Sequence, residues 1–395
     1  MSEERNRHNR VSLGTEPEQH VPPTRNYILL AIYGSVFCER FCFFLLISVL
    51  VLFLHERCGY SPALAVRWYG MFVSSCYLTS ILGGRLCDGK MGANRVSFLG
   101  LVIQAVGFVL LTMETPNLTL IILLFIALGA GLFKAGTQTL LGSLPLHPAS
   151  VRERAFGVIY VIVNIAGLLA PLIGGAVQTM TGYRPLFVML VGSALLGSTC
   201  LLPTLAHRPT HSYPVQVQLP AVQPTSPRAV LALILASGML FAAAFVQSHS
   251  TLLLFVRDHI DRQLGRFTIP VAWFGAAPGA MVLLISPVAA LAFSVLRKRN
   301  REPSTLRKVA IGMVITALAF LPIWGAVRAA HGGHLVSPLW VLACIAMLSL
   351  GELLVGAHAP AEISRIAPPS HTGRWMSYWF VATALGNIVG GWVEW

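Results

Sequence analysis

Residues 27–54 read YILLAIYGSVFCERFCFFLLISVLVLFL, an apolar run that holds the adjacent charged residues Glu39 and Arg40 near its middle. About 20 apolar residues are enough for one membrane-spanning helix. A charge at the centre of a bilayer is costly, so such residues usually face a bundle interior or an aqueous cavity and mark an ion or substrate pathway. We therefore predict that Glu39 and Arg40 are functional. The alternative is an ion pair that only orients the first helix.

The composition places the whole chain in a membrane. Of its 395 residues, 55% are hydrophobic and only 11% are charged, and the mean hydropathy is +0.71. These values indicate an all-α polytopic membrane protein and exclude a soluble enzyme. The net charge of +13 lies mainly in short loops between apolar segments, which argues against a nucleic-acid partner. The seven cysteines include no CxxC pair, so we expect no metal site and no cofactor.

Eleven apolar segments alternate with polar ones. Together with a polar N-terminus and a linker, they give four regions. A polar N-terminus, residues 1–26, precedes six segments in residues 27–204. A Pro-rich linker, residues 205–228, separates these from five segments in residues 229–395. The predicted spans are 27–54, 67–87, 94–113, 118–141, 155–178, 184–204, 229–256, 270–296, 306–327, 338–364 and 373–393.

The lysines and arginines in alternate loops predict the orientation. With the N-terminus inside, the inner segments carry 19 of these residues and the outer segments 7, while Arg40 and Lys134 lie within spans. Because cytoplasmic loops are enriched in lysine and arginine, the count predicts a cytoplasmic N-terminus in an inner or plasma membrane. One loop departs from the rule, since it places Arg257, Arg262 and Arg266 outside.

Six spans, a linker and further spans resemble the two-halves plan of the major facilitator superfamily, whose substrate site lies between the halves near the midplane. The segment GGRLCDGK at 83–90 resembles the loop motif of that superfamily. The resemblance implies that the glycines of this motif, Gly83 and Gly84 among them, permit close helix approach, and that Gly84, Arg85 and Asp88 belong to a cytoplasmic gate. The second half is one span short of that plan, so we expect the helix that normally completes it to be absent.

Five further motifs, in order along the chain, resemble those of the proton-dependent oligopeptide transporters. The match extends from about residue 27 to residue 392. The motifs are ERFCFF at 39–44, GLFK at 131–134, YVIVNIAGLLAPLIGG at 160–175, GELL at 351–354, and WF at 379–380 followed by ALGN at 384–387.

This resemblance implies roles for individual residues. Arg40 and Lys134 would hold a substrate carboxylate, and Glu352 would hold an ammonium group when it is not paired with Lys134. For the uncharged polar residues, interhelical hydrogen bonding and packing remain the alternative. The expected proton-coupling residues are Glu39, Arg40, Lys134 and Glu352, and the expected substrate-binding residues are Arg40, Phe43, Phe44, Tyr77, Lys134, Asn164, Gln247, Glu352, Trp379 and Asn387.

Several positions depart from the family pattern. Val36 stands where the first acid of the first-helix motif is expected, and Ala277 where an eighth-span asparagine is expected. Ile47 and Val246 stand in place of both members of one gate ion pair. Joint loss is easier than single loss, because a buried pair replaced by apolar residues can be neutral whereas one remaining partner is a stranded charge.

These features predict a membrane transporter of di- and tripeptides or peptide-like molecules, working by alternating access and driven by proton symport. Its expected partners are the substrate, protons and the lipid bilayer. The losses at Val36, Ile47 and Val246 leave open an exporter or an uncoupled facilitator of a peptide-derived metabolite. The short second half leaves open a nontransporting sensor or assembly subunit, or an inactive product.

Overall fold

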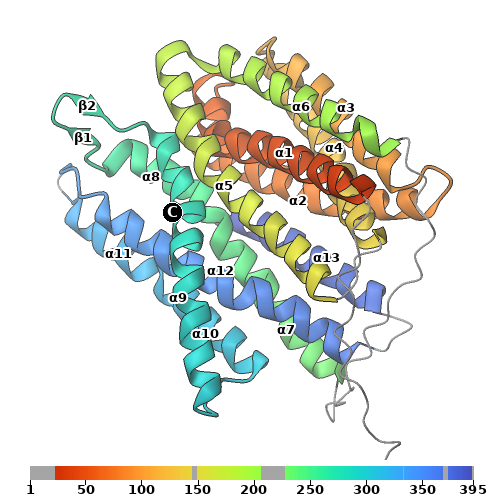
Figure 1. The fold of residues 1–395 in the computed structure, drawn as a ribbon. Coiled ribbons are helices and arrows are strands. Elements are labelled where there is room, and N and C mark those ends of the chain that lie inside the picture. The colour runs from red at the N-terminus through yellow and green to blue at the C-terminus, as the bar shows by residue number, and fades with distance from the viewer. Residues whose placement is uncertain (1–22, 145–148, 206–226, 332, 368–371, 394–395) are drawn as a thin grey trace, which may run out of the picture.

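The chain folds into a bundle of long helices with one small two-stranded hairpin (Figure 1). The all-α polytopic fold predicted from the sequence is confirmed. Most of the predicted N-terminal segment and of the predicted linker, residues 1–22 and 206–226, lies outside the described residues. The computed structural model describes residues 23–144, 149–205, 227–331, 333–367 and 372–393.

Six helices precede the linker. Their ends follow local signals: Ser61 Oγ accepts a hydrogen bond from the backbone N–H of Leu64 at the start of the second helix, and Pro62 occupies its first turn. The six are α1 (Pro23–Glu56), α2 (Pro62–Asp88), α3 (Ala93–Leu111), α4 (Pro116–Ser143), α5 (Ala149–Thr181) and α6 (Tyr183–Leu205).

Five spans follow the linker, and three of them are divided into shorter helical pieces. The seventh consists of α7 (Pro227–Phe245), η2 (Val246–His249) and α8 (Thr251–His259), the eighth of η3 (Val271–Ala276) and α9 (Ala277–Lys298), and the ninth of α10 (Thr305–Leu318) and α11 (Phe320–Ala329). The tenth is α12 (Leu339–Ile366) and the eleventh is α13 (Thr372–Gly391). Strands β1 (Gln263–Leu264) and β2 (Phe267–Thr268) form the antiparallel hairpin between α8 and η3.

The bundle has two ends, which we name by what lies there. At the hairpin end, α1 connects to α2 and the β1–β2 hairpin follows α8. At the linker end, α6 finishes at Leu205 and α7 begins at Pro227. Figure 1 shows the first group of helices at the upper right and the second group at the lower left, with α5 and α9 adjoining between them.

The two groups repeat one packing scheme. In the first, α3 packs against α4 and α1 against α5; in the second, α10 packs against α12 and α7 against α13. The first group also has α6, which covers α1 and α3. Accordingly, 78% of the most apolar stretch of α1 is buried, against 33% for the span that begins with α7. Among the described residues, no helix of the second group takes the place that α6 has in the first.

Nine helical stretches of the described chain are long and apolar enough to cross a membrane. The two predicted spans outside this set are α2 and α13, which lie side by side across the halves. The Ser74 hydroxyl of α2 donates to the Ala384 carbonyl of α13 at 2.8 Å. Polar groups at this interface lower the hydropathy of both helices while satisfying one another inside the bundle.

Small residues bring α3 and α4 into backbone contact. A Cβ atom at Gly100 of α3 would lie 2.5 Å from the Phe133 nitrogen and 2.6 Å from the Gly129 oxygen of α4. Glycine is required at such a position because any side chain would separate the two helices. This contact positions α4, and with it Lys134, one residue after Phe133.

Replacing Gly100 by Val should therefore destabilise the first half by about 1–3 kcal/mol, the usual cost of overpacking. The matched control is Gly192→Val in α6, because a Cβ atom at Gly192 meets nothing within 4 Å. Thermal unfolding in detergent should show a lower midpoint for Gly100→Val than for Gly192→Val. Equal midpoints would show that the α3–α4 contact is not tight.

Candidate functional site

Glu39 and Arg40 form an ion pair near the middle of α1. The Arg40 side chain donates to both carboxylate oxygens of Glu39, from Nε at 2.5 Å and from Nη2 at 2.7 Å. The Glu39 side chain is fully buried, whereas that of Arg40 remains 18% exposed and lies over the Phe43 ring at 4.7 Å. The charge of the buried Glu39 carboxylate is thus balanced by Arg40. The Arg40 guanidinium lies on the Phe43 ring.

Lys134 on α4 is the second cation of this region. Its ammonium lies 3.8 Å from the centre of the Tyr77 ring and 5.4 Å from that of Phe380, so two aromatic faces stabilise it. It also lies within electrostatic range of Arg40. Among the described residues, no carboxylate forms a salt bridge with Lys134.

Glu352 on α12 contributes the opposite charge from the second half. The described residues provide no salt bridge to this half-buried side chain, although it lies within electrostatic range of Tyr77 and Tyr160. The predicted Lys134–Glu352 ion pair is therefore not formed in this conformation. An intramembrane carboxylate and an intramembrane ammonium without ion partners can each accept a charged ligand group.

The three charged positions lie well inside their helices. Glu39, Lys134 and Glu352 are separated from the hairpin-end terminus of their helices by 17, 18 and 13 residues. At 1.5 Å per residue these separations correspond to about 26, 27 and 20 Å. Tyr77 lies under Lys134 and within electrostatic range of Arg40 and Glu352, so cations on α1 and α4 and a carboxylate on α12 adjoin one region of the bundle.

Aromatic and polar side chains on neighbouring helices complete this region. Phe43 and Phe44 pack edge to face with ring centres 5.6 Å apart, and Phe44 faces the α5 backbone at Gly167. Asn164 on α5 donates to the Tyr160 carbonyl at 2.9 Å. The structure thus brings together five predicted site residues through direct contacts or electrostatic proximity: Glu39, Arg40, Phe43, Tyr77 and Lys134. Three more lie on neighbouring elements: Phe44, Asn164 and Glu352.

Three of the predicted substrate residues lie elsewhere. Gln247 is buried and donates to the Gly390 carbonyl at 2.7 Å, joining η2 to α13. Trp379 packs on Gly238 of α7. Asn387 is buried in α13, where its carbonyl faces Gly70 of α2. These contacts give all three residues a structural part, and their role in substrate binding stays a prediction.

The loop motif at the linker end of α2 is partly as expected. Gly83, rather than Gly84, makes the close approach to α4, because a Cβ atom there would lie 2.8 Å from that of Ala135, whereas nothing lies within 4 Å of one at Gly84. Arg85 and Asp88 are exposed. In the part of the chain that the structure describes, neither forms a salt bridge. Their gate role stays a prediction.

The positions that depart from the family pattern are apolar and well packed. Val36 is buried in the cluster that also contains Ile32 and Leu201. Ile47 and Val246 are buried in one apolar cluster, which lies mostly in the first half. Next to Val246, both His249 ring nitrogens are within hydrogen-bonding distance of a partner: Ser248 Oγ at 2.9 Å and the Gly275 carbonyl at 3.3 Å.

The halves meet closely at the hairpin end. The Arg67 guanidinium lies 4.3 Å from the Trp392 ring, and a Cβ atom at Gly70 would lie 2.6 Å from the Asn387 carbonyl oxygen. On the other side of the bundle, Trp273 Nε1 donates to the Leu172 carbonyl at 2.9 Å. These contacts close the hairpin end between α2 and α13 and between η3 and α5.

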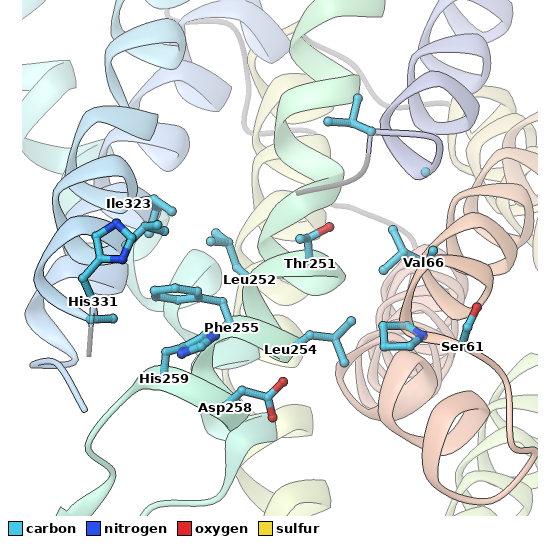
Figure 2. A pocket seen from close by; sticks show the side chains of 16 residues that line it. Ser61, Val66, Thr251, Leu252, Leu254, Phe255, Asp258, His259, Ile323 and His331 are labelled. Atoms are coloured by element: carbon cyan, nitrogen blue, oxygen red, sulfur yellow. The ribbon is translucent and has the colours of Figure 1, made fainter. Parts of the chain in front are cut away.

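A cavity of about 620 Å³ also lies at the hairpin end, between α2 on one side and α8 and α11 on the other. Figure 2 shows Ser61 and Val66 on one wall and His259 and His331 opposite, with Leu252 and Thr251 between them. None of the described residues that line it belongs to the charged region around Lys134. It is therefore a separate feature from the candidate site.

Comparison with known proteins decides the family. The sequence profile of the Major Facilitator Superfamily matches residues 32–391, which is most of the chain. The chain belongs to the major facilitator superfamily. It is therefore a multi-pass membrane protein related to transporters.

Within the superfamily, its relatives include peptide transporters. The peptide transporter YePEPT of Yersinia enterocolitica is 26% identical, over 92% of this chain and 86% of the relative. Dipeptide and tripeptide permease B of the same species is 25% identical, over 90% and 83%. A crystal structure of the peptide transporter POT with sulfate has a TM-score of 0.83 at 20% identity, covering 92% of this chain and 87% of the other. The predicted resemblance to proton-dependent oligopeptide transporters is confirmed.

The sequence analysis assigned no role to several residues that the structure brings to the site. Phe380 forms the second aromatic face on Lys134, and Tyr160 lies near Glu352. Tyr160 precedes Asn164 by one helical turn, so the spacing already placed both on one face of α5. Arg67 and Trp392 have no such signal, because their contact joins segments far apart in the sequence.

The Glu39–Arg40 pair allows a stability test. Replacing Glu39 alone by Leu strands a buried guanidinium, which typically costs 3–5 kcal/mol, whereas joint replacement of both residues by Leu removes the charges together and should cost much less. Thermal unfolding in detergent should rank the double variant above Glu39→Leu. A double variant no more stable than the single one would show that Arg40 finds other partners.

Proposed function

We propose that this chain carries di- and tripeptides or similar zwitterions across the membrane by alternating access. The observation that carries the proposal is the arrangement of Lys134 and Glu352, which lie on opposite halves, each near Tyr77, without a salt bridge between them. In this proposal Lys134 and Arg40 bind the substrate carboxylate and Glu352 binds its ammonium. Phe43, Tyr77 and Phe380 supply an aromatic wall.

The two halves give the proposed transport cycle its mechanical basis. A substrate held between Lys134 in the first half and Glu352 in the second draws the halves together at the site, and its binding energy favours the conformations in which both contacts are made. Without substrate, the same two charges can pair directly once the halves close. The conformation described is closed at the hairpin end.

Protons are the proposed energy source, and no cofactor or catalytic residue is part of the proposal. Protonation of Glu39 would release Arg40 from the bidentate pair, so that the guanidinium becomes available to a substrate carboxylate. Loss of that proton would restore the pair and compete with the substrate. Proton and substrate would thus alternate at one charge cluster.

The proposed orientation places the linker end and the N-terminus in the cytoplasm. The support is the distribution of lysine and arginine, 19 in the linker-end segments against 7 in the hairpin-end segments. The hairpin end then faces outward, and the conformation described is closed to the outside. The membrane is the inner or plasma membrane of the cell.

An uncoupled facilitator or exporter is the second candidate, and the apolar packing of Val36, Ile47 and Val246 favours it. These side chains remove charges that could carry or relay a proton. Such a protein would move substrate down its own gradient while keeping the Lys134 and Glu352 site.

Lys134→Ala should reduce uptake of a labelled dipeptide into proteoliposomes about 10- to 100-fold, because one charge-assisted contact to the carboxylate is lost. Arg184→Ala is the matched control, since it removes an exposed cation at the hairpin end of α6. Both variants must have thermal unfolding midpoints close to that of the unaltered chain, so that lost uptake does not reflect lost folding. Undiminished uptake by folded Lys134→Ala would remove this residue from the site.

The energy source is tested by imposing an inward proton gradient on proteoliposomes that contain the unaltered chain or Glu39→Gln. We expect accumulation of the dipeptide only with the gradient and only with Glu39 present, while both proteins exchange internal for external dipeptide without a gradient. Flux that ignores a protonophore would identify the facilitator. Binding without exchange would identify a sensor.

A further inference from the structure

The turn between α9 and α10 holds the densest group of cations in the chain. Figure 1 shows this turn at the lower edge of the bundle, away from the first six helices. The turn at the same position in the first half, between α2 and α3, is far less basic, with Arg85, Lys90 and Arg95 near Asp88. Residues 297–308 contain Arg297, Lys298, Arg299, Arg301, Arg307 and Lys308 and a single acid, Glu302.

Glu302 holds the two sides of this turn together. Its carboxylate accepts hydrogen bonds from Arg297 Nε and from Lys308 Nζ, each at 2.7 Å. These two cations lower the pKa of Glu302 to about 2, so the carboxylate is ionised at any physiological pH. The backbone N–H of Arg301 also donates to the Leu296 carbonyl at 2.9 Å. The turn is therefore a defined structure in which two of the six cations are compensated.

The other four cations are uncompensated. Lys298, Arg299, Arg301 and Arg307 are exposed, and within the described residues none of their side chains forms a salt bridge. Four like charges within ten residues repel one another. An anion with several oxygen atoms would relieve that repulsion and satisfy several donors at once.

Exposed apolar residues adjoin the turn on both helices. Leu291 and Val295 of α9 are 66% and 41% exposed, and Leu306 and Ile311 of α10 are 40% and 46% exposed. In the span that ends with α9, only 11% of the most apolar stretch is buried inside the protein. The basic turn thus lies where an apolar helix surface ends, which is the level of lipid headgroups.

We propose that the α9–α10 turn binds the phosphate of an anionic phospholipid, whose acyl chains lie along the exposed apolar residues of α9 and α10. Guanidinium groups bind phosphate oxygens in pairs, and four or more cations next to a membrane span suit anionic headgroups. The apolar surface beside the turn favours a lipid over a free phosphate. Assignment to the cytoplasmic leaflet rests on the proposed orientation, whereas the binding itself does not.

The test compares Arg299→Gln/Arg301→Gln with Arg184→Gln/Arg266→Gln, a control that removes two exposed arginines at the hairpin end. Dioctanoyl phosphatidylglycerol is titrated into each full-length protein in neutral detergent, and the thermal unfolding midpoint is followed. We expect the test variant to bind about 30-fold more weakly than the unaltered chain, from about 1 kcal/mol per cation. The control variant should bind within about twofold of the unaltered chain, a difference below 0.5 kcal/mol.

Other ligands distinguish the sources of the anion. Dioctanoyl phosphatidylcholine, which has no net charge, and inorganic phosphate should each leave the midpoint nearly unchanged. An equal response to inorganic phosphate would assign the turn to a soluble anion, and a response only to a polyglutamate peptide would assign it to an acidic protein. Either result would overturn the proposal, as would equal phosphatidylglycerol affinity in both variants.

Discussion

A charged side chain inside an apolar bundle must find a partner, because the bilayer offers no water to solvate it. This constraint separates the intramembrane charges of the chain into two kinds. Glu39 and Arg40 satisfy each other through two hydrogen bonds within one helix. Within the described residues, Lys134 lies on two aromatic faces without a salt bridge, and Glu352 has no salt bridge either. The difference makes the first pair a candidate switch and the second a candidate binding site.

Close helix packing fixes where those charges lie. Backbone contact at Gly100 sets the position of α4, and the approach of Gly83 holds α2 against the same helix, so that Tyr77 and Lys134 meet. At the hairpin end, the halves are closed by Gly70, Arg67 and Trp392. The contact between the halves here depends on shape and on a cation–π interaction, while Ile47 and Val246 lie in an apolar cluster.

Sequence reasoning was most successful where the signal is local. Apolar segment length predicted the eleven helical segments, nine of which are long and apolar enough to cross a membrane, and the charged residues within them gave Glu39, Arg40, Lys134 and Glu352 as candidates. It was less successful where the outcome depends on how helices face one another. Nothing in the sequence states that Gly83 rather than Gly84 faces α4, or that Gln247 turns towards the Gly390 carbonyl. It also left room for a Lys134–Glu352 pair, which is not formed in the conformation described.

The central claim is that the first half binds the negative end of a zwitterion and the second half the positive end. The most direct measurement is a cycle of binding affinities that combines Lys134→Ala and Glu352→Gln with dialanine, its amidated form and its N-acetylated form. The account predicts that amidation weakens binding to the unaltered chain and to Glu352→Gln, and weakens it less in Lys134→Ala, where Arg40 alone remains to bind the carboxylate. N-acetylation should weaken binding except in Glu352→Gln. If both modifications weaken binding equally in all three proteins, the two residues do not bind the substrate termini and the account is contradicted.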